Sequence, residues 1–206
     1  MIKYMINEIF WSAQGEGAMA GYPSIFIRLA GCSLKCDYCD TKNSWLEGKL
    51  LSESEILEKV EIYLKEYPES RIVLTGGEPL EQDLFSLVEK LKKMDLFVSI
   101  ETNGVNYQKL NIDWWTVSPK DVADFEINDN LKEFVSEIKL VVNPNLTINV
   151  IKRIRKIGNN FPIFLQPQFF DTGKYGNTYD LYKKCQRSGI KNILVGFQLH
   201  RIYDID

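Results

Sequence analysis

The chain has 206 residues, of which 45% are hydrophobic and 26% charged, and its formal net charge is −3. This length suits one globular domain with a sizeable core, so we expect a single domain over 1–206. The slight acidity argues against nucleic acid or an anionic membrane as a partner. No segment approaches the roughly 18 consecutive apolar residues of a membrane-spanning helix, and the N-terminus lacks a signal-peptide pattern. We therefore expect a cytoplasmic protein.

Runs rich in β-forming residues alternate with amphipathic runs along the chain. A strand is expected over 24–30, followed by a helix that begins at the capping-box pattern Ser52-x-x-Glu55 and ends near residue 66. Further strands are expected over 71–75, 96–101, 114–117, 137–142, 162–165 and 192–197, with helices over 81–94, 146–157 and 178–187. Strands separated by helices of this length imply right-handed crossovers and parallel pairing. The predicted fold class is α/β.

The less common polar residues gather directly after the expected strands. They are Cys32 and the clusters 76–79 (GGEP), 101–103 (ETN), 118–120 (SPK), 166–168 (QPQ) and 198–200 (QLH). In β/α barrels and open parallel sheets the active site lies at the carboxyl ends of the strands. Turns after strands are commonly polar, but that explains Gly and Asn better than the recurring Glu, Lys and His. We expect one composite site at this edge.

Three of the four cysteines lie within one short loop, CSLKCDYC, as Cys32, Cys36 and Cys39. This grouping is unlike a disulfide framework and typical of metal binding in a reducing compartment. A four-iron, four-sulfur cluster held in the ferredoxin manner needs four cysteines, and we expect the remote Cys185 to be a core residue. Three thiolates would leave one iron open to another ligand. The alternative is a structural zinc site completed by His200, although zinc ligands usually come in two spaced pairs.

The cysteine loop resembles the first motif of the radical S-adenosylmethionine (SAM) superfamily, with Tyr38 as the aromatic residue before the last cysteine. Gly76-Gly77-Glu78-Pro79 resembles that superfamily's second motif, which meets the amino group of the methionine moiety. Independently of the resemblance, paired glycines lack Cβ atoms and let the backbone approach a ligand closely.

Within this superfamily the chain resembles the 7-carboxy-7-deazaguanine synthase family, almost from end to end. The resemblance is carried by Gln14-Gly15-Glu16-Gly17, Arg28, Asp40-Thr41, Ser118-Pro119-Lys120 and Gln198-Leu199-His200. It implies a compact, incomplete β/α barrel with mostly parallel strands, which forms a homodimer. It also implies a carbon–nitrogen lyase that contracts the ring of 6-carboxy-5,6,7,8-tetrahydropterin to 7-carboxy-7-deazaguanine with release of ammonia. The product would serve the biosynthesis of queuosine- or archaeosine-type 7-deazapurines.

The resemblance implies a 4Fe-4S cluster, SAM and Mg²⁺ as cofactors, with a flavodoxin or ferredoxin as reductant. The cofactors carry the radical chemistry, so no side chain is expected to be catalytic. Residues expected to bind SAM are Tyr38, Cys39, Asp40, Gly77, Glu78, Ser118, Pro119, Lys120, Gln166 and Pro167. Residues expected to bind substrate are Ala13, Gln14, Gly15, Glu16, Arg28, Thr75, His200 and Asp206.

Three of these residues have a specific chemical reason for their role. Lys120 offers a compact ammonium to the carboxylate of methionine, and the planar fork of Arg28 suits a substrate carboxylate. Thr41 would be the only protein ligand to magnesium, which commonly keeps several waters. Without the resemblance, Thr41 would be interpreted as a turn or cap residue, and Arg28 as part of an ion pair at the rim.

Two other functions remain open from the sequence. One is a small radical SAM activase that acts on a partner protein, which would share the cysteine loop and the Gly-Gly-Glu turn. Such an enzyme gives no reason for Gln14, Arg28 or Thr41. The other is a non-catalytic iron–sulfur protein, which would not cleave SAM.

Overall fold

The computed structural model describes residues 2–158, 160–168 and 177–205. These residues form one sheet whose strands are ordered β3-β1-β2-β4-β5-β6-β7-β8-β9. The strands are β1 (Lys3–Ala13), β2 (Pro23–Leu29), β3 (Lys49–Ser52), β4 (Arg71–Gly76), β5 (Val98–Thr102), β6 (Trp114–Val117), β7 (Glu137–Val142), β8 (Ile163–Pro167) and β9 (Ile193–Val195). All neighbours from β2 to β9 are parallel, whereas β1 is antiparallel to both β2 and β3. In the described part of the chain the sheet is not closed, which confirms the predicted incomplete α/β barrel.

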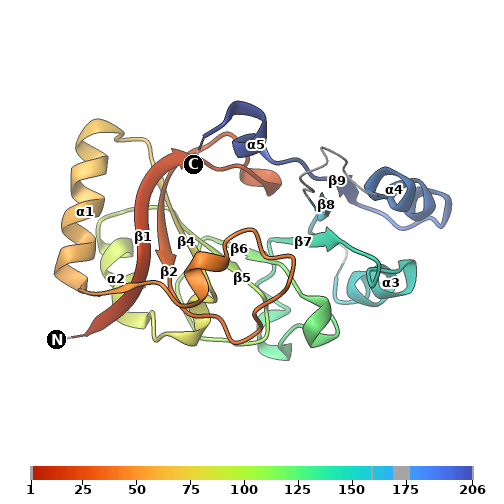
Figure 1. Ribbon diagram of the computed structural model, residues 1–206, viewed down its shortest axis with the longest axis horizontal. Coiled ribbons are helices and arrows are strands. Elements are labelled where there is room, and N and C mark those ends of the chain that lie inside the picture. Colours follow the sequence, from red (N-terminus) through yellow and green to blue (C-terminus); the bar gives the residue numbers. More distant parts are fainter. Residues whose placement is uncertain (1, 159, 169–176, 206) are drawn as a thin grey trace.

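Five α-helices are described, and the four longest pack outside the sheet (Figure 1). The five are α1 (Glu53–Glu66), α2 (Phe85–Lys93), α3 (Ile148–Arg155), α4 (Thr178–Arg187) and α5 (Leu199–Tyr203). Figure 1 shows α1 and α2 beside β1, β2 and β4, with α3 and α4 at the opposite end of the molecule near β7 to β9. The capping box at the start of α1 is confirmed, because the Ser52 hydroxyl accepts the Glu55 N–H while the Glu55 carboxylate accepts the Ser52 N–H.

The second helix begins later than the sequence predicts. The expected helix over 81–94 is instead a 3-10 turn, Pro79–Glu81, followed by α2 from Phe85. The Asp83 carboxylate accepts the Phe85 N–H and so satisfies a donor at the start of the helix. The turn over 79–81 belongs to the segment after β4. It is tied to the cysteine loop, because the Glu81 carboxylate accepts the Ser33 N–H.

Two strands, β1 and β3, were not predicted. A β-bulge between Ile6 and Glu8 interrupts the register of β1 against β2, and several residues in the second half of β1 are half-buried on either face. This removes the strict alternation by which a strand is recognised in a sequence. The strand is held by β2 and β3, with which it pairs on its two sides.

Alternation along the parallel strands separates two layers of side chains. One face is apolar and packs under the helices; it includes Ile25, Ile27, Leu29, Ile72, Leu74, Ile100, Val117, Ile138, Leu140, Ile163 and Leu165. The intervening positions point to the other, inner face, and many of these are polar: Arg28, Thr75, Glu101, Thr116, Glu137, Lys139 and Gln166. Strand register brings them side by side, since Arg28 pairs with Thr75, and Thr116 with both Glu101 and Glu137. The sheet therefore presents a polar inner face.

Candidate active site

A cavity of about 850 Å³ opens on the inner face, at the carboxyl ends of the strands. It is lined by side chains of the cysteine loop, of the turns after β4, β5, β6 and β8, of the 13–16 segment and of the C-terminal segment at Gln198 and His200. The clusters that follow the strands in sequence thus contribute to one site, as the strand order predicts. Two residues expected to bind SAM, Glu78 and Pro119, do not line the cavity.

The three loop cysteines all line the cavity. Cys36 is buried and its carbonyl accepts the Cys39 N–H at 3.0 Å, which closes a turn. Burial raises the pKa of the Cys32 and Cys36 thiols, while the Lys120 ammonium lowers that of Cys36. A bound metal would replace these protons, because the thiolate is the ligand.

Cysteine thiols in a loop serve two kinds of metal site, a single ion and a four-iron cluster, and the two need different spacings. Among the described residues, no three His, Cys, Asp or Glu side chains approach closely enough to hold one metal ion. A zinc site completed by His200 requires such convergence, whereas the thiolates of a 4Fe-4S cluster bind different irons. Cys185 lies in α4 within the hydrophobic core, which confirms its predicted structural place.

The glycines of the turn after β4 are required by close packing between backbones. Gly76 has φ +125°, and a Cβ there would lie 2.1 Å from the Leu29 carbonyl oxygen. A Cβ on Gly77 would lie 1.9 Å from the carbonyl oxygen of Gly31. The turn therefore abuts the chain at the start of the cysteine loop, with Gly77 facing the cavity. Any side chain at either position would separate these two segments.

Glu78 stabilises this turn from behind the cavity. Its carboxylate accepts hydrogen bonds from the Thr102 hydroxyl (2.7 Å), the Asn103 N–H (2.7 Å) and the Leu80 N–H (3.1 Å). Burial raises the pKa of Glu78 to about 7, and these three donors act in the opposite direction. The side chain thus joins the turn after β4 to the segment after β5.

A buried lysine lies between two carboxylates on the inner face. Lys139 Nζ is 2.9 Å from Glu101 Oε1 and 3.0 Å from Glu16 Oε2. Burial alone would lower the pKa of Lys139, but the two carboxylates raise it above its usual value. Burial likewise would raise the pKa of Glu101, but Lys139 lowers it below its usual value. Lys139 and Glu101 therefore stabilise each other's charged forms, and all three side chains line the cavity.

Glutamine side-chain amides and one threonine hydroxyl also donate hydrogen bonds to Glu16 and Glu101. Glu16 Oε1 accepts from Gln198 Nε2 (2.8 Å) and Gln166 Nε2 (3.1 Å). Glu101 accepts from the Thr75 hydroxyl (3.0 Å) and from Gln14 Nε2 (3.2 Å). Residues of five segments far apart in the chain thereby meet at the floor of the cavity.

Sequence reasoning gave no individual role to Glu101 or Lys139. Glu101 was included in a cluster after a strand, but Lys139 was not singled out. The signal in the sequence was a charged residue in the middle of the apolar run EIKLVV. A charge within a buried strand requires a partner of opposite charge, which only the fold supplies.

The 13–18 segment is fixed between the sheet and the C-terminal helix. The Ala18 N–H donates to Glu137 Oε2 at 2.7 Å, and a Cβ on Gly17 (φ +71°) would lie 2.3 Å from Glu137 Oε1. On the other side, the Leu199 N–H donates to the Gly15 carbonyl at 2.9 Å. Burial raises the pKa of Glu137. The expected substrate residues Ala13, Gln14, Gly15, Glu16 and His200 are thus gathered on one side of the cavity.

Arg28 and Thr41 lie together at the wall. Arg28 Nε donates to Glu8 Oε1 at 2.7 Å, and its Nη1 lies 3.5 Å from Thr41 Oγ1. The Thr41 hydroxyl donates to Asp40 Oδ1 at 2.9 Å and makes no capping bond to the short helix that follows. Elsewhere on the wall, Lys120 Nζ donates to the Ser118 hydroxyl at 2.7 Å. Asp206, the last expected substrate residue, lies outside the described residues.

Comparisons with known proteins agree with this geometry. A sequence model of the radical SAM superfamily matches residues 26–166. A protein named 7-carboxy-7-deazaguanine synthase from Rickettsia prowazekii (strain Madrid E) is 36% identical over 172 residues, covering 80% of this chain and 73% of the relative. The chain belongs to the 7-carboxy-7-deazaguanine synthase family of radical SAM enzymes.

A second relative and a solved structure are also similar to this chain. The protein of that name from Buchnera aphidicola subsp. Schizaphis graminum (strain Sg) is 36% identical over 187 residues, covering 80% of this chain and 84% of the relative. The crystal structure of QueE from Escherichia coli superposes with a TM-score of 0.75 at 29% identity, covering 95% of this chain and 94% of that one. Radical SAM membership carries with it a 4Fe-4S cluster and SAM as cofactors. Among the described residues, no helix combines the length and apolar character that crossing a bilayer requires.

Proposed function

We propose that this chain converts 6-carboxy-5,6,7,8-tetrahydropterin to 7-carboxy-7-deazaguanine with release of ammonia, in the biosynthesis of 7-deazapurines of the queuosine or archaeosine type. The observation that carries the proposal is the cavity itself, whose lining joins the cysteine loop to the carboxylates Glu16 and Glu101 and to Arg28. This combination suits a small, polar, carboxylated heterocycle. The names of the relatives agree with it.

On the cofactor side, Cys32, Cys36 and Cys39 would hold the cluster. The SAM pocket would be formed by Tyr38, Asp40, Gly77, Ser118, Lys120, Gln166 and Pro167, all of which line the cavity. The cluster and SAM, when bound, would supply a 5′-deoxyadenosyl radical that removes one hydrogen atom from the substrate. Glu78 and Pro119 would act by shaping the turns that carry Gly77 and Lys120.

On the substrate side, the charges of the cavity match those of a carboxylated pterin. Glu8 occupies Nε of Arg28 and Thr41 Oγ1 accepts from Nη1 at 3.5 Å, which leaves Nη2 and the second Nη1 hydrogen for the substrate carboxylate. The pyrimidine edge of a pterin presents an amino group and a ring N–H, for which Glu16 and Glu101 offer carboxylate acceptors. Gln14 and Thr75 orient Glu101, and Gln166 and Gln198 orient Glu16.

The proposal also includes a magnesium ion at Thr41. The Thr41 hydroxyl is directed to the wall beside Arg28 rather than used as a helix cap. An ion there would share the substrate carboxylate with Arg28 and complete its shell with water, as magnesium commonly does.

The chain is further proposed to work as a single domain over 1–206 and as a cytoplasmic homodimer. The open edge strands of the sheet, β3 and β9, favour a second copy as cover. The electron would come from a flavodoxin or ferredoxin.

The test is turnover after anaerobic reconstitution of the cluster. The protein is mixed with SAM, a chemical reductant and the carboxylated tetrahydropterin, and the product is identified by mass. The expected result is 7-carboxy-7-deazaguanine and one ammonia per turnover, absent from a Cys36→Ala control. SAM cleavage that the pterin neither stimulates nor couples to product would reject this substrate and favour the activase. A cluster without any SAM cleavage would favour a non-catalytic iron–sulfur protein.

A further inference from the structure

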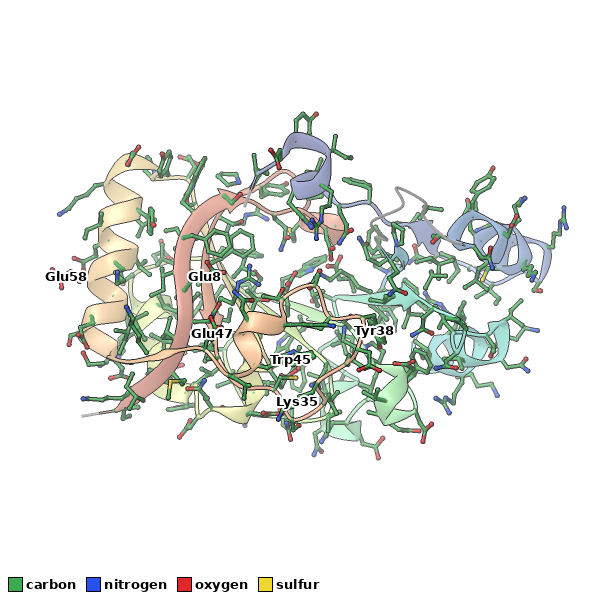
Figure 2. All side chains as sticks on the ribbon, in the orientation of Figure 1. Glu8, Lys35, Tyr38, Trp45, Glu47 and Glu58 are labelled. Atoms are coloured by element: carbon green, nitrogen blue, oxygen red, sulfur yellow. The ribbon has the colours of Figure 1, made fainter. Side chains whose placement is uncertain are left out.

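One carboxylate outside the expected cofactor residues joins three loops of the site. Asp121 Oδ1 accepts the Tyr38 hydroxyl at 2.6 Å, and its Oδ2 accepts the side-chain amides of Asn143 (2.9 Å) and Asn145 (2.8 Å). Tyr38, labelled in Figure 2, belongs to the cysteine loop, whereas Asp121 follows β6 and the two asparagines follow β7. The Val122 N–H also donates to Oδ1 at 3.0 Å. The position of the carboxylate is therefore determined by four donors.

The Tyr38 contact acts on the part of the loop that carries two of the cysteines. Tyr38 lies between Cys36 and Cys39, whose backbones form a turn through the Cys39 N–H and the Cys36 carbonyl. A hydrogen bond at the far end of the tyrosine ring therefore restrains the orientation of this turn. Asp121, for its part, directly follows Lys120, whose ammonium lines the same cavity.

A second carboxylate holds the other end of the loop in the same way. The Ser33 N–H and hydroxyl both donate to Glu81 Oε1, at 3.0 and 2.5 Å. Glu81 ends the 3-10 turn that follows Gly77. The cysteine loop is thus tied at its start to the turn after β4 and near its end to the turn after β6. Both turns line the site expected to hold SAM.

We propose that Asp121 is a positioning residue for SAM: through the Tyr38 hydroxyl it fixes the Cys36–Cys39 turn against the turn that carries Ser118 and Lys120. SAM must reach the open iron of the cluster and the Lys120 turn at once, so its affinity depends on the separation of these two segments. Breaking the hydrogen bond between Tyr38 and Asp121 leaves all three loop cysteines in place. The cluster is therefore expected to assemble without this contact. The inference rests on radical SAM membership and is independent of the substrate proposed above.

The test is a double-mutant cycle on the anaerobically reconstituted protein. Tyr38→Phe removes only the hydroxyl, Asp121→Ala removes its acceptor, and the double variant removes both. Asp121→Asn is the near-isosteric variant: its carbonyl oxygen can accept from the Tyr38 hydroxyl and the Val122 N–H, as Oδ1 does, while its amide replaces Oδ2 opposite the two asparagines. Glu126→Gln, an exposed carboxylate six residues after Lys120, is the matched control.

Three quantities are measured: iron per chain, the Kd for SAM, and the change in the electron paramagnetic resonance spectrum of the reduced cluster on addition of SAM. Tyr38→Phe and Asp121→Ala are expected to keep their iron and to weaken SAM binding roughly tenfold, as for a lost hydrogen bond to a charged group. The double variant should be no weaker than either single variant. Glu126→Gln should bind SAM nearly as wild type does, and Asp121→Asn, which keeps an acceptor for the Tyr38 hydroxyl, should lose less affinity than Asp121→Ala. The spectral change should be smaller in Tyr38→Phe at equal SAM occupancy.

Three results would overturn the inference. An unchanged SAM affinity in Tyr38→Phe, which keeps the ring and its packing, would remove the contact from cofactor positioning. Additive losses in the double variant would mean that the two residues act separately. Loss of iron in Tyr38→Phe equal to its loss of SAM binding would make the contact a support for loop folding only.

Discussion

Replacing Lys139 by methionine probes the charge network at the cavity floor. Methionine keeps the apolar stem of lysine but leaves Glu16 and Glu101 without the cation that lies 3.0 and 2.9 Å from them. The lysine side chain is 8% exposed, and the carboxylate side chains are 16% and 21% exposed. Removing one partner from a buried pair costs about 3–5 kcal/mol of unfolding free energy. Because the carboxylates retain some contact with water, we expect the lower end, about 3 kcal/mol.

The loss should depend on pH in a defined direction. In the wild type, Lys139 lowers the pKa of Glu101 below its usual 4.5, so Glu101 stabilises the fold above that pH and loses this contribution as the pH falls through its folded pKa. In Lys139→Met, burial is opposed only by the Thr75 hydroxyl and the more distant Arg28, so we expect that pKa to rise. The carboxylate then destabilises the fold increasingly as the pH rises above 4.5. The difference between the two proteins should be largest near neutral pH and shrink in mild acid.

The assay is urea unfolding of the metal-free chains, followed by circular dichroism at about pH 7 and about pH 5. The variant Lys139→Met/Glu101→Gln is the matched control, since it removes one of the two unpaired charges and should recover part of the loss. A difference below about 1 kcal/mol, typical of exposed ion pairs, would refute the assignment of a buried network. A difference that is the same at both pH values would refute the role given to the carboxylates.

Three further predictions test the remaining assignments. Cys36→Ala should abolish both cluster iron and SAM cleavage, whereas the core variant Cys185→Ala should keep both within about twofold; equal iron loss would contradict a three-cysteine cluster. Arg28→Lys should raise the substrate Kd at least about tenfold with little effect on SAM, because an ammonium does not replace the bidentate fork; equal losses for both ligands would count against a substrate role. Thr41→Val should lose most of the rate gain from added magnesium while Thr41→Ser retains it; an unchanged response in the valine variant would return Thr41 to a turn role.

Several features were predictable from local sequence alone. The strands over 114–117 and 137–142 occur where predicted, because each is a short run rich in β-forming residues. The helix over 178–187 also occurs where predicted. The capping box at Ser52 is likewise local. The cysteine loop needs no tertiary information either, since its three thiols lie within eight positions.

Other features were decided only when the strands came together. The β1 strand depends on neighbours on both sides and carries a bulge, so its own pattern did not reveal it. Lys139 is an isolated charge in an apolar run until the fold places Glu16 and Glu101 beside it. The contact between Tyr38 and Asp121 joins residues 83 positions apart.

The sequence by itself determined which chemical groups this protein has and that most of them follow strands. It determined the loop of thiols completely, because chain connectivity alone brings those groups together. The tertiary structure decided which groups touch: the lysine between two carboxylates, the arginine beside a threonine, and the tyrosine on an aspartate. Those contacts depend on strand order and register, which arise from packing between distant segments, so no short stretch of the chain identifies the partners.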